Sequence, residues 1–176
     1  MVAEPIAASP AVAGTRGDTD VAGVYAEGIR AGLVGAATIA LWFLALDTLA
    51  GRPFYTPTVL GTALFRGGEG LDTSGALAPS LEMVLSFTWV HVLVFLLIGV
   101  AAARLLLLAE RDPSFGFGVL LLLVVFEAGF FLVSMVVAEP VVRAVAWPAV
   151  LVGNLLAAAA MGAVFWRRHP RLAINP

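Results

Sequence analysis

Four long apolar stretches dominate the sequence, at residues 29–50, 80–108, 115–138 and 145–166. At about 1.5 Å per helical residue, each is long enough to cross a hydrocarbon core about 30 Å thick. A backbone inside lipid must satisfy its own hydrogen bonds, so we expect each stretch to be an α-helix. The pattern predicts an all-α protein, a polytopic bundle of four transmembrane helices within residues 28–168.

The chain between the first two stretches carries signals of its own. A Gly-Arg-Pro sequence at residues 51–53 ends the first helix, because proline cannot continue helical hydrogen bonding. Thr56 followed by Pro57 is typical of an N-cap and a first helical position. They predict a short helix over residues 58–65, ended by a Gly-Gly pair. It is too short to span, so we expect an interfacial helix in the first outer loop.

Both ends of the chain are predicted to lie outside the membrane. Residues 1–27 are rich in Ala, Gly, Pro, Thr and Asp and lack apolar periodicity, which predicts a disordered tail, and residues 169–176 form a C-terminal tail. Arginines near the helix ends are more numerous on the side of the termini, which favours cytoplasmic termini. That side holds Arg16, Arg30, Arg104, Arg111, Arg167, Arg168 and Arg171, and the other holds Arg52, Arg66 and Arg143.

Composition supports a membrane protein and excludes some functions. Hydrophobic residues make up 61% of the chain and charged residues 12%, whereas soluble domains are about 25% charged. The formal net charge of -2 gives no reason to expect a nucleic-acid partner. With no cysteine, the chain can form neither a disulfide nor a cysteine-based metal site. The expected partner is the lipid bilayer.

A few polar residues interrupt the apolar stretches. Glu127 is the only ionisable residue in the third stretch and lies at its centre, where a charge must face protein or water. His91 and Asn154 lie near the middle of the second and fourth stretches, so we expect them at a similar depth. Asp47 and Ser134 are expected one to two turns further outward. Asp47 is also close to Arg52 in the sequence, which predicts a salt bridge at the helix end.

Two interpretations of this polar cluster remain open. The side chains can join the helices by hydrogen bonds, or they can bind a small ligand or a proton. We expect a non-enzymatic membrane protein, either an accessory subunit or a small-ligand binder. The alternative is a proton-coupled transporter or channel using Glu127 and His91. No metal or cofactor is expected, since there is no H-E-x-x-H spacing and no second intramembrane histidine for a haem.

Small residues recur every four positions along the first stretch. Gly28, Gly32, Ala36 and Ala40 form a smooth stripe of the kind that lets membrane helices approach closely. We expect this stripe to pack against another helix, within the chain, in a homo-oligomer or in a larger membrane complex.

Several short motifs resemble those of uncharacterised small four-helix integral membrane proteins of bacteria. They are GRPFYTP at 51–57 with Leu60 and Gly61, VFE at 125–127, VGNL at 152–155 and WRRHP at 166–170. The resemblance covers residues 28–171. It implies a four-helix fold and a location in a bacterial inner membrane, and it implies no activity.

Overall fold

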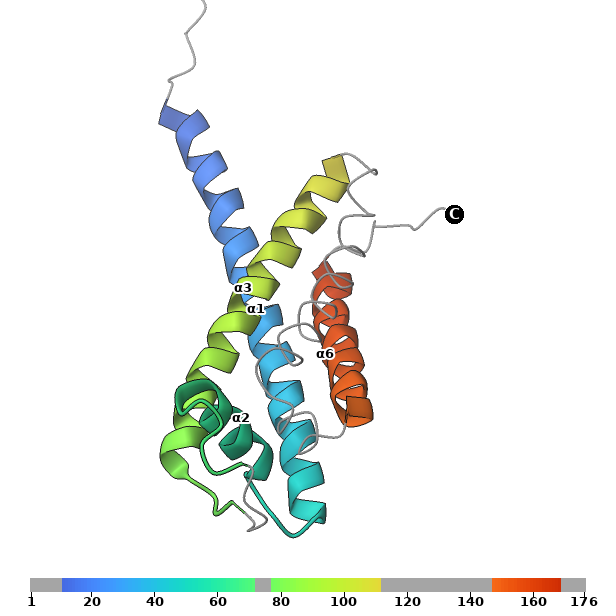
Figure 1. Cartoon of the computed structure of the whole chain (residues 1–176). Helices are drawn as coiled ribbons and strands as arrows, with labels where there is room; N and C mark the ends of the chain where they lie inside the picture. The colour runs from blue at the N-terminus through green and yellow to red at the C-terminus, as the bar shows by residue number, and fades with distance from the viewer. Residues whose placement is uncertain (1–10, 72–76, 112–146, 169–176) are drawn as a thin grey trace, which may run out of the picture.

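The structure, a computed structural model, describes residues 11–71, 77–111 and 147–168, and all regular structure in these ranges is helical (Figure 1). The helices are α1 (Ala11–Leu49), α2 (Tyr55–Phe65), α3 (Leu81–Arg111) and α6 (Trp147–Arg168). Three segments are long and apolar enough to span a membrane: Val21–Leu49, Leu81–Ala109 and Pro148–Arg167. The predicted all-α class and three of the four predicted spans are therefore confirmed.

The third predicted span lies outside the described residues. It comprises residues 115–138 and includes Glu127 and Ser134, so a fourth transmembrane helix stays a prediction.

The first helix begins much earlier than its apolar stretch. α1 starts at Ala11, so residues 11–27 are helical instead of part of an unstructured tail. No proline occurs between Pro10 and Pro53. Because extending an existing helix costs far less than nucleating one, the packed part of α1 can propagate back to Pro10. Apolar periodicity predicts the part of a helix that packs against other helices or lipid. It gives no signal for a helical extension that lacks such periodicity.

α1 and α3 run antiparallel and cross at a point where both backbones carry glycine (Figure 1). A Cβ atom on Gly28 would lie 2.5 Å from the Cα atom of Val100. A Cβ on Gly32 would meet the Phe95 carbonyl oxygen, and one on Gly99 would meet the Gly28 carbonyl oxygen. The two helices are thus in backbone contact, which any larger side chain at these positions would prevent.

α6 packs beside the second half of α1, also antiparallel (Figure 1). Gly35 faces the sulfur of Met161, and Gly153 faces the Trp42 ring. The Trp42 indole Nε1 donates a hydrogen bond to the Ala149 carbonyl oxygen at 2.8 Å. α1 is therefore the helix on which both of the other long helices pack, around a core of Ala31, Ala36, Phe95, Ala103, Ala157, Met161 and Phe165.

α2 lies against the first turns of α3, near the end of α1 (Figure 1). Gly61 allows close approach, since a Cβ there would lie 2.5 Å from the Met83 carbonyl oxygen. The short helix is confirmed, but its start differs from the predicted one. Phe54, with φ 64, is the residue before the helix, and Thr56 and Pro57 lie in the first turn. Proline is tolerated there because first-turn N–H groups have no intrahelical acceptor.

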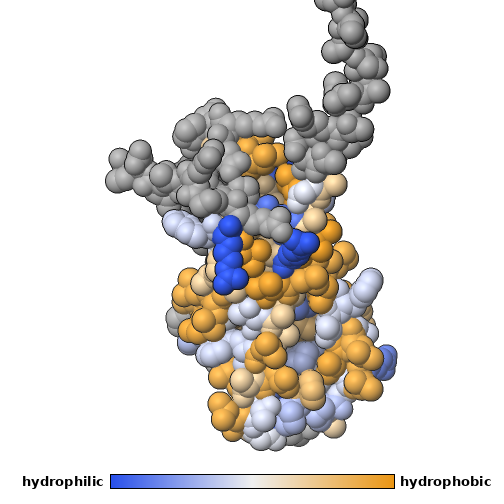
Figure 2. Space-filling view, turned by 180° about the vertical axis from the view of Figure 1, so that it is seen from behind, coloured by the Kyte–Doolittle hydropathy of each residue, from blue (hydrophilic) through white to orange (hydrophobic). Residues whose placement is uncertain are grey.

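Large apolar side chains cover much of the surface (Figure 2). Leu41, Leu97 and Trp166 are each about two-thirds exposed, and Leu49 is 85% exposed. In water, apolar exposure on this scale would favour aggregation, whereas lipid is a suitable solvent for it. The surface therefore agrees with the three candidate spans.

Candidate functional site

Asp47 binds the start of α2 instead of an arginine. Its carboxylate is buried and accepts two hydrogen bonds of 2.7 Å, from the backbone N–H and the hydroxyl of Thr56. An acid in this position satisfies a first-turn N–H and complements the positive end of the helix dipole. Arg52 instead lies over the Tyr55 ring, with 4.0 Å between Cζ and the ring centre. The predicted salt bridge between Asp47 and Arg52 is therefore wrong.

The expectation went wrong for a reason of geometry. Arg52 follows Asp47 closely in sequence, but its backbone N–H donates to the Asp47 carbonyl oxygen at 2.8 Å in the turn that ends α1. That turn places the backbone of Arg52 near Asp47, and the carboxylate meets the start of α2. Asp47 is thus a structural residue that ties α2 to α1.

His91 lies inside the α3 span, between two aromatic rings. Its ring centre is 5.8 Å from that of Phe87 and 4.8 Å from that of Phe95. Its Nε2 is 3.1 Å from the carbonyl oxygen of Ala36 on α1. A carbonyl only accepts, so Nε2 carries the proton, and in the neutral ring Nδ1 is the acceptor. His91 thus joins α3 to α1 and keeps one ring nitrogen able to accept a proton or a hydrogen bond.

Asn154 lies on α6, next to the glycine that faces α1. Its side-chain Nδ2 is buried and makes no hydrogen bond within the part of the chain that the structure describes. The depth of Asn154 can be compared with that of His91 along α1. Gly153 faces Trp42 and Ile39, and His91 binds Ala36, which lies three to six residues away, or about 4.5–9 Å along the helix axis. Glu127, the third member of the predicted cluster, lies outside the described residues.

The small-residue stripe on α1 follows α3 for part of its length. Gly28, Gly32 and Ala36 are buried, whereas Ala40 is exposed. The helices cross at an angle, so the stripe separates from α3 after a few turns. Within the described residues, no group of three His, Cys, Asp or Glu side chains could hold a metal ion.

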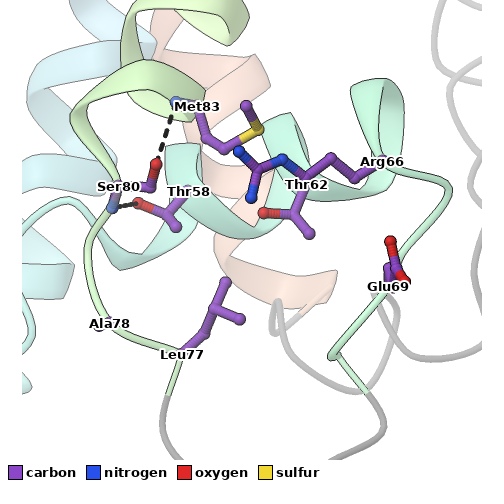
Figure 3. Close-up of a pocket in the computed structure, with 8 residues that line it drawn as sticks. All are labelled: Thr58, Thr62, Arg66, Glu69, Leu77, Ala78, Ser80 and Met83. Carbon is purple, nitrogen blue, oxygen red and sulfur yellow. Dashed lines mark hydrogen bonds between the residues drawn. The ribbon is translucent and has the colours of Figure 1, made fainter.

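A pocket of about 250 Å³ lies between α2 and the start of α3 (Figure 3). The lining residues are Thr58, Thr62, Arg66, Glu69, Leu77, Ala78, Ser80 and Met83. Sequence reasoning missed this site, although α2 carried a signal. Thr58, Thr62 and Arg66 are spaced four residues apart, which places three polar side chains on one face of a mostly apolar helix.

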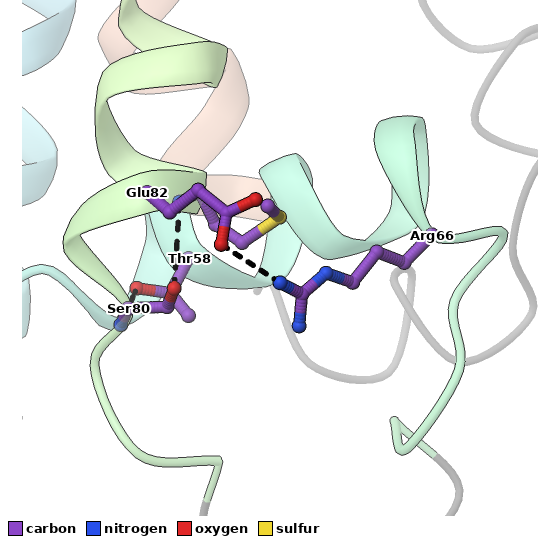
Figure 4. Close-up of polar contacts among 5 residues, drawn as sticks. Thr58, Arg66, Ser80 and Glu82 are labelled. Carbon is purple, nitrogen blue, oxygen red and sulfur yellow. Dashed lines mark hydrogen bonds and ion pairs between the residues drawn. The ribbon is translucent and has the colours of Figure 1, made fainter.

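Polar contacts fix the walls of this pocket. Arg66 Nη2 forms an ion pair of 2.9 Å with Glu82, the second residue of α3 (Figure 4). The Thr58 hydroxyl donates to the Phe54 carbonyl oxygen and accepts a 3.3 Å hydrogen bond from the Ser80 backbone N–H. These contacts attach the start of α3 to α2.

Arg104 marks the opposite end of the α3 span. Its guanidinium donates a 2.6 Å hydrogen bond to the Tyr25 hydroxyl and lies 4.9 Å from the centre of that ring. The pair bridges α3 and α1 beyond the glycine crossing. An arginine paired with a tyrosine in this position is typical of a membrane–water interface.

No family model, no curated protein and no solved structure matches the chain, so the geometry described above is the basis for proposing its function.

Proposed function

We propose that the protein is a four-span membrane protein in which residues 115–138 form the remaining transmembrane helix. The support is connectivity. α3 ends on the side where α1 begins, and α6 begins on the side where α1 ends (Figure 1). The chain between Arg111 and Trp147 must therefore pass from one end of the described bundle to the other. The apolar stretch at 115–138 has the length for that passage.

The proposed orientation places both termini in the cytoplasm of a bacterial cell, with the protein in the inner membrane. Arg30, Arg104 and Arg167 are exposed on the side where α1 begins and α6 ends. At the other end, Arg52 and Arg66 are exposed as well, so the support for this orientation is the larger number of arginines on the first side. An excess of arginine near the ends of the spans favours the cytoplasmic side.

The proposed function is that of a non-enzymatic accessory subunit or small-ligand binder with a polar cluster inside the membrane. The observation that carries it is the buried Nδ2 of Asn154, a donor that forms no hydrogen bond within the described residues. In hydrocarbon such a donor is costly, so it calls for an acceptor from another segment or from a ligand. Glu127 is the acceptor that we propose, because it is the only ionisable residue of the proposed remaining span.

One observation favours the alternative, a proton-coupled transporter or channel. The His91 Nε2 donates a hydrogen bond to the Ala36 carbonyl oxygen, so Nδ1 is the acceptor nitrogen of the neutral ring. Nδ1 can therefore take up a proton while the contact to α1 persists. With Glu127 at a similar depth, the two groups would provide two titratable positions in the membrane. This alternative predicts that the protein moves protons, whereas the leading proposal does not.

A double-mutant cycle tests the proposed partnership of Asn154 and Glu127. Replacing Glu127 by Leu strands the Asn154 amide, so the free energy of unfolding should fall by about 1–3 kcal/mol. In an Asn154→Leu background the same replacement should cost much less, because no donor is left to strand. Thermal unfolding in detergent measures both effects, and Glu82→Leu serves as the control acid outside the cluster. Strictly additive losses would show that the two residues do not interact.

Function is tested with Glu127→Gln, which keeps the shape and removes the charge. If the protein is an accessory subunit, this variant folds and co-purifies with the same partners as the parent. If it is a small-ligand binder, the variant folds but loses the bound species. Reconstituted in vesicles, neither the parent nor Glu127→Gln should transport protons across the membrane. A proton flux in the parent that disappears in Glu127→Gln would replace the leading proposal by the alternative.

A further inference from the structure

The pocket between α2 and α3 is separate from the proposed intramembrane cluster and carries a different chemistry. It lies directly before the α3 span, which begins at Leu81. Ser80 and Glu69 line it from the loop, and Met83, which is 3% exposed, lines it from the first turn of α3. The pocket is therefore at the level of lipid head groups, with polar groups beside an apolar wall.

Arg66 supplies an anion-binding group whose N–H donors are not all used by the ion pair with Glu82. A guanidinium has five N–H donors, and the ion pair with Glu82 is formed by Nη2. The arginine side chain is about half exposed and extends across the pocket toward Met83 and Thr62 (Figure 3). Its remaining donors can bind the oxygens of a phosphate, the geometry to which a guanidinium is suited.

Thr62 supplies a second polar group at the pocket wall. The residue is 4% exposed, and it lines the pocket one turn before Arg66. The hydroxyl of Thr58, one turn earlier, both donates and accepts. A hydroxyl that lines a pocket can donate to or accept from a ligand oxygen.

The acidic residues decide which phosphate compound fits. Glu69 lines the pocket, and Glu82 binds Arg66, so the three ionisable groups carry one positive and two negative charges. A purely anionic ligand would meet a net negative site. A ligand that carries both a phosphate and an ammonium group complements the positive and the negative side chains. Its phosphate would bind Arg66 and Thr62, and its ammonium would lie near Glu69.

We propose that this pocket binds a zwitterionic phosphoethanolamine group. The same chemistry occurs in two sources, the head group of phosphatidylethanolamine and free glycerophosphoethanolamine. The position at the end of the span favours the lipid, whose acyl chains could continue along the exposed apolar side chains of α3, among them Leu81 and Leu85.

The test is titration of the full chain in detergent, followed by native mass spectrometry. The ligands are dihexanoyl-phosphatidylethanolamine, glycerophosphoethanolamine and dihexanoyl-phosphatidylglycerol, which carries the phosphate without the ammonium. We expect one molecule of the ethanolamine lipid per chain and weaker binding of the glycerol lipid. Binding of glycerophosphoethanolamine as well would identify the head group as sufficient, and binding of the lipid alone would identify the membrane as the source.

Variants separate ligand contacts from structural effects. Arg66→Gln should weaken binding of the ethanolamine lipid about tenfold, because a charge-assisted contact is lost. Glu82→Gln also breaks the ion pair with Arg66 but keeps the guanidinium, so it should retain binding. Arg52→Gln, at the same end of the molecule, should change the affinity less than about twofold. The proposal is overturned if neither ethanolamine compound binds, if the glycerol lipid binds equally well, or if Arg66→Gln binds like the parent.

Discussion

Three polar side chains of this protein each join two segments. Asp47 connects the end of α1 to the start of α2, and His91 connects α3 to the backbone of α1. Trp42 does the same between α1 and α6. Such contacts are directional, so they fix the rotation of each helix where apolar packing in lipid alone would specify it weakly.

Asp47→Ala should destabilise the protein at the junction of α1 and α2. The substitution leaves the buried N–H and hydroxyl of Thr56 without their acceptor, at a cost of about 1–3 kcal/mol for each stranded group. Thermal unfolding in detergent measures the loss. Thr48→Ala is the matched control, because its hydroxyl is exposed and donates only within α1. Equal unfolding temperatures for the two variants would show that the Asp47 contact contributes nothing.

At the scale of elements, α1 is the helix on which α3 and α6 pack. The spacing of small residues predicted a smooth face, and Gly28 and Gly32 lie in backbone contact with α3. The crossing angle could not be predicted, because it depends on how the residues of both helices interdigitate. The spacing therefore predicts one continuous face that includes Ala40, whereas Ala40 is exposed in the structure, and Gly35, which lies outside that spacing, faces α6.

Paired leucine substitutions distinguish the two ends of this stripe. Gly32→Leu inserts a side chain where the Phe95 backbone lies, so we expect a loss of at least about 1–3 kcal/mol or failure to assemble. Ala40→Leu adds the same side chain at an exposed position and should leave the unfolding temperature nearly unchanged. Equal stability of both variants in detergent would contradict the observed crossing.

At the scale of the whole molecule, the sequence predicts the transmembrane spans best, because the thickness of the membrane sets their minimum length. It predicts helix ends and contacts between distant parts of the chain least well. Apolar stretches of sufficient length predicted the three described spans. The helical extension before residue 28 could not be predicted, because its small and polar residues carry no periodic apolar signal. The pocket beside Arg66 joins residues 58–66 to 77–83, and the sequence did not indicate which side chains would meet across that loop.

The central claim is that the chain crosses the membrane four times with both termini in the cytoplasm. Because the chain contains no cysteine, single cysteines can be introduced without background labelling. The decisive measurement is the reaction of Asp112→Cys and Arg143→Cys in intact cells with a membrane-impermeant maleimide, with Gly68→Cys as the external reference. Our account predicts that positions 68 and 143 are labelled at once and position 112 only after permeabilisation. Labelling of positions 112 and 143 from the same side would contradict it.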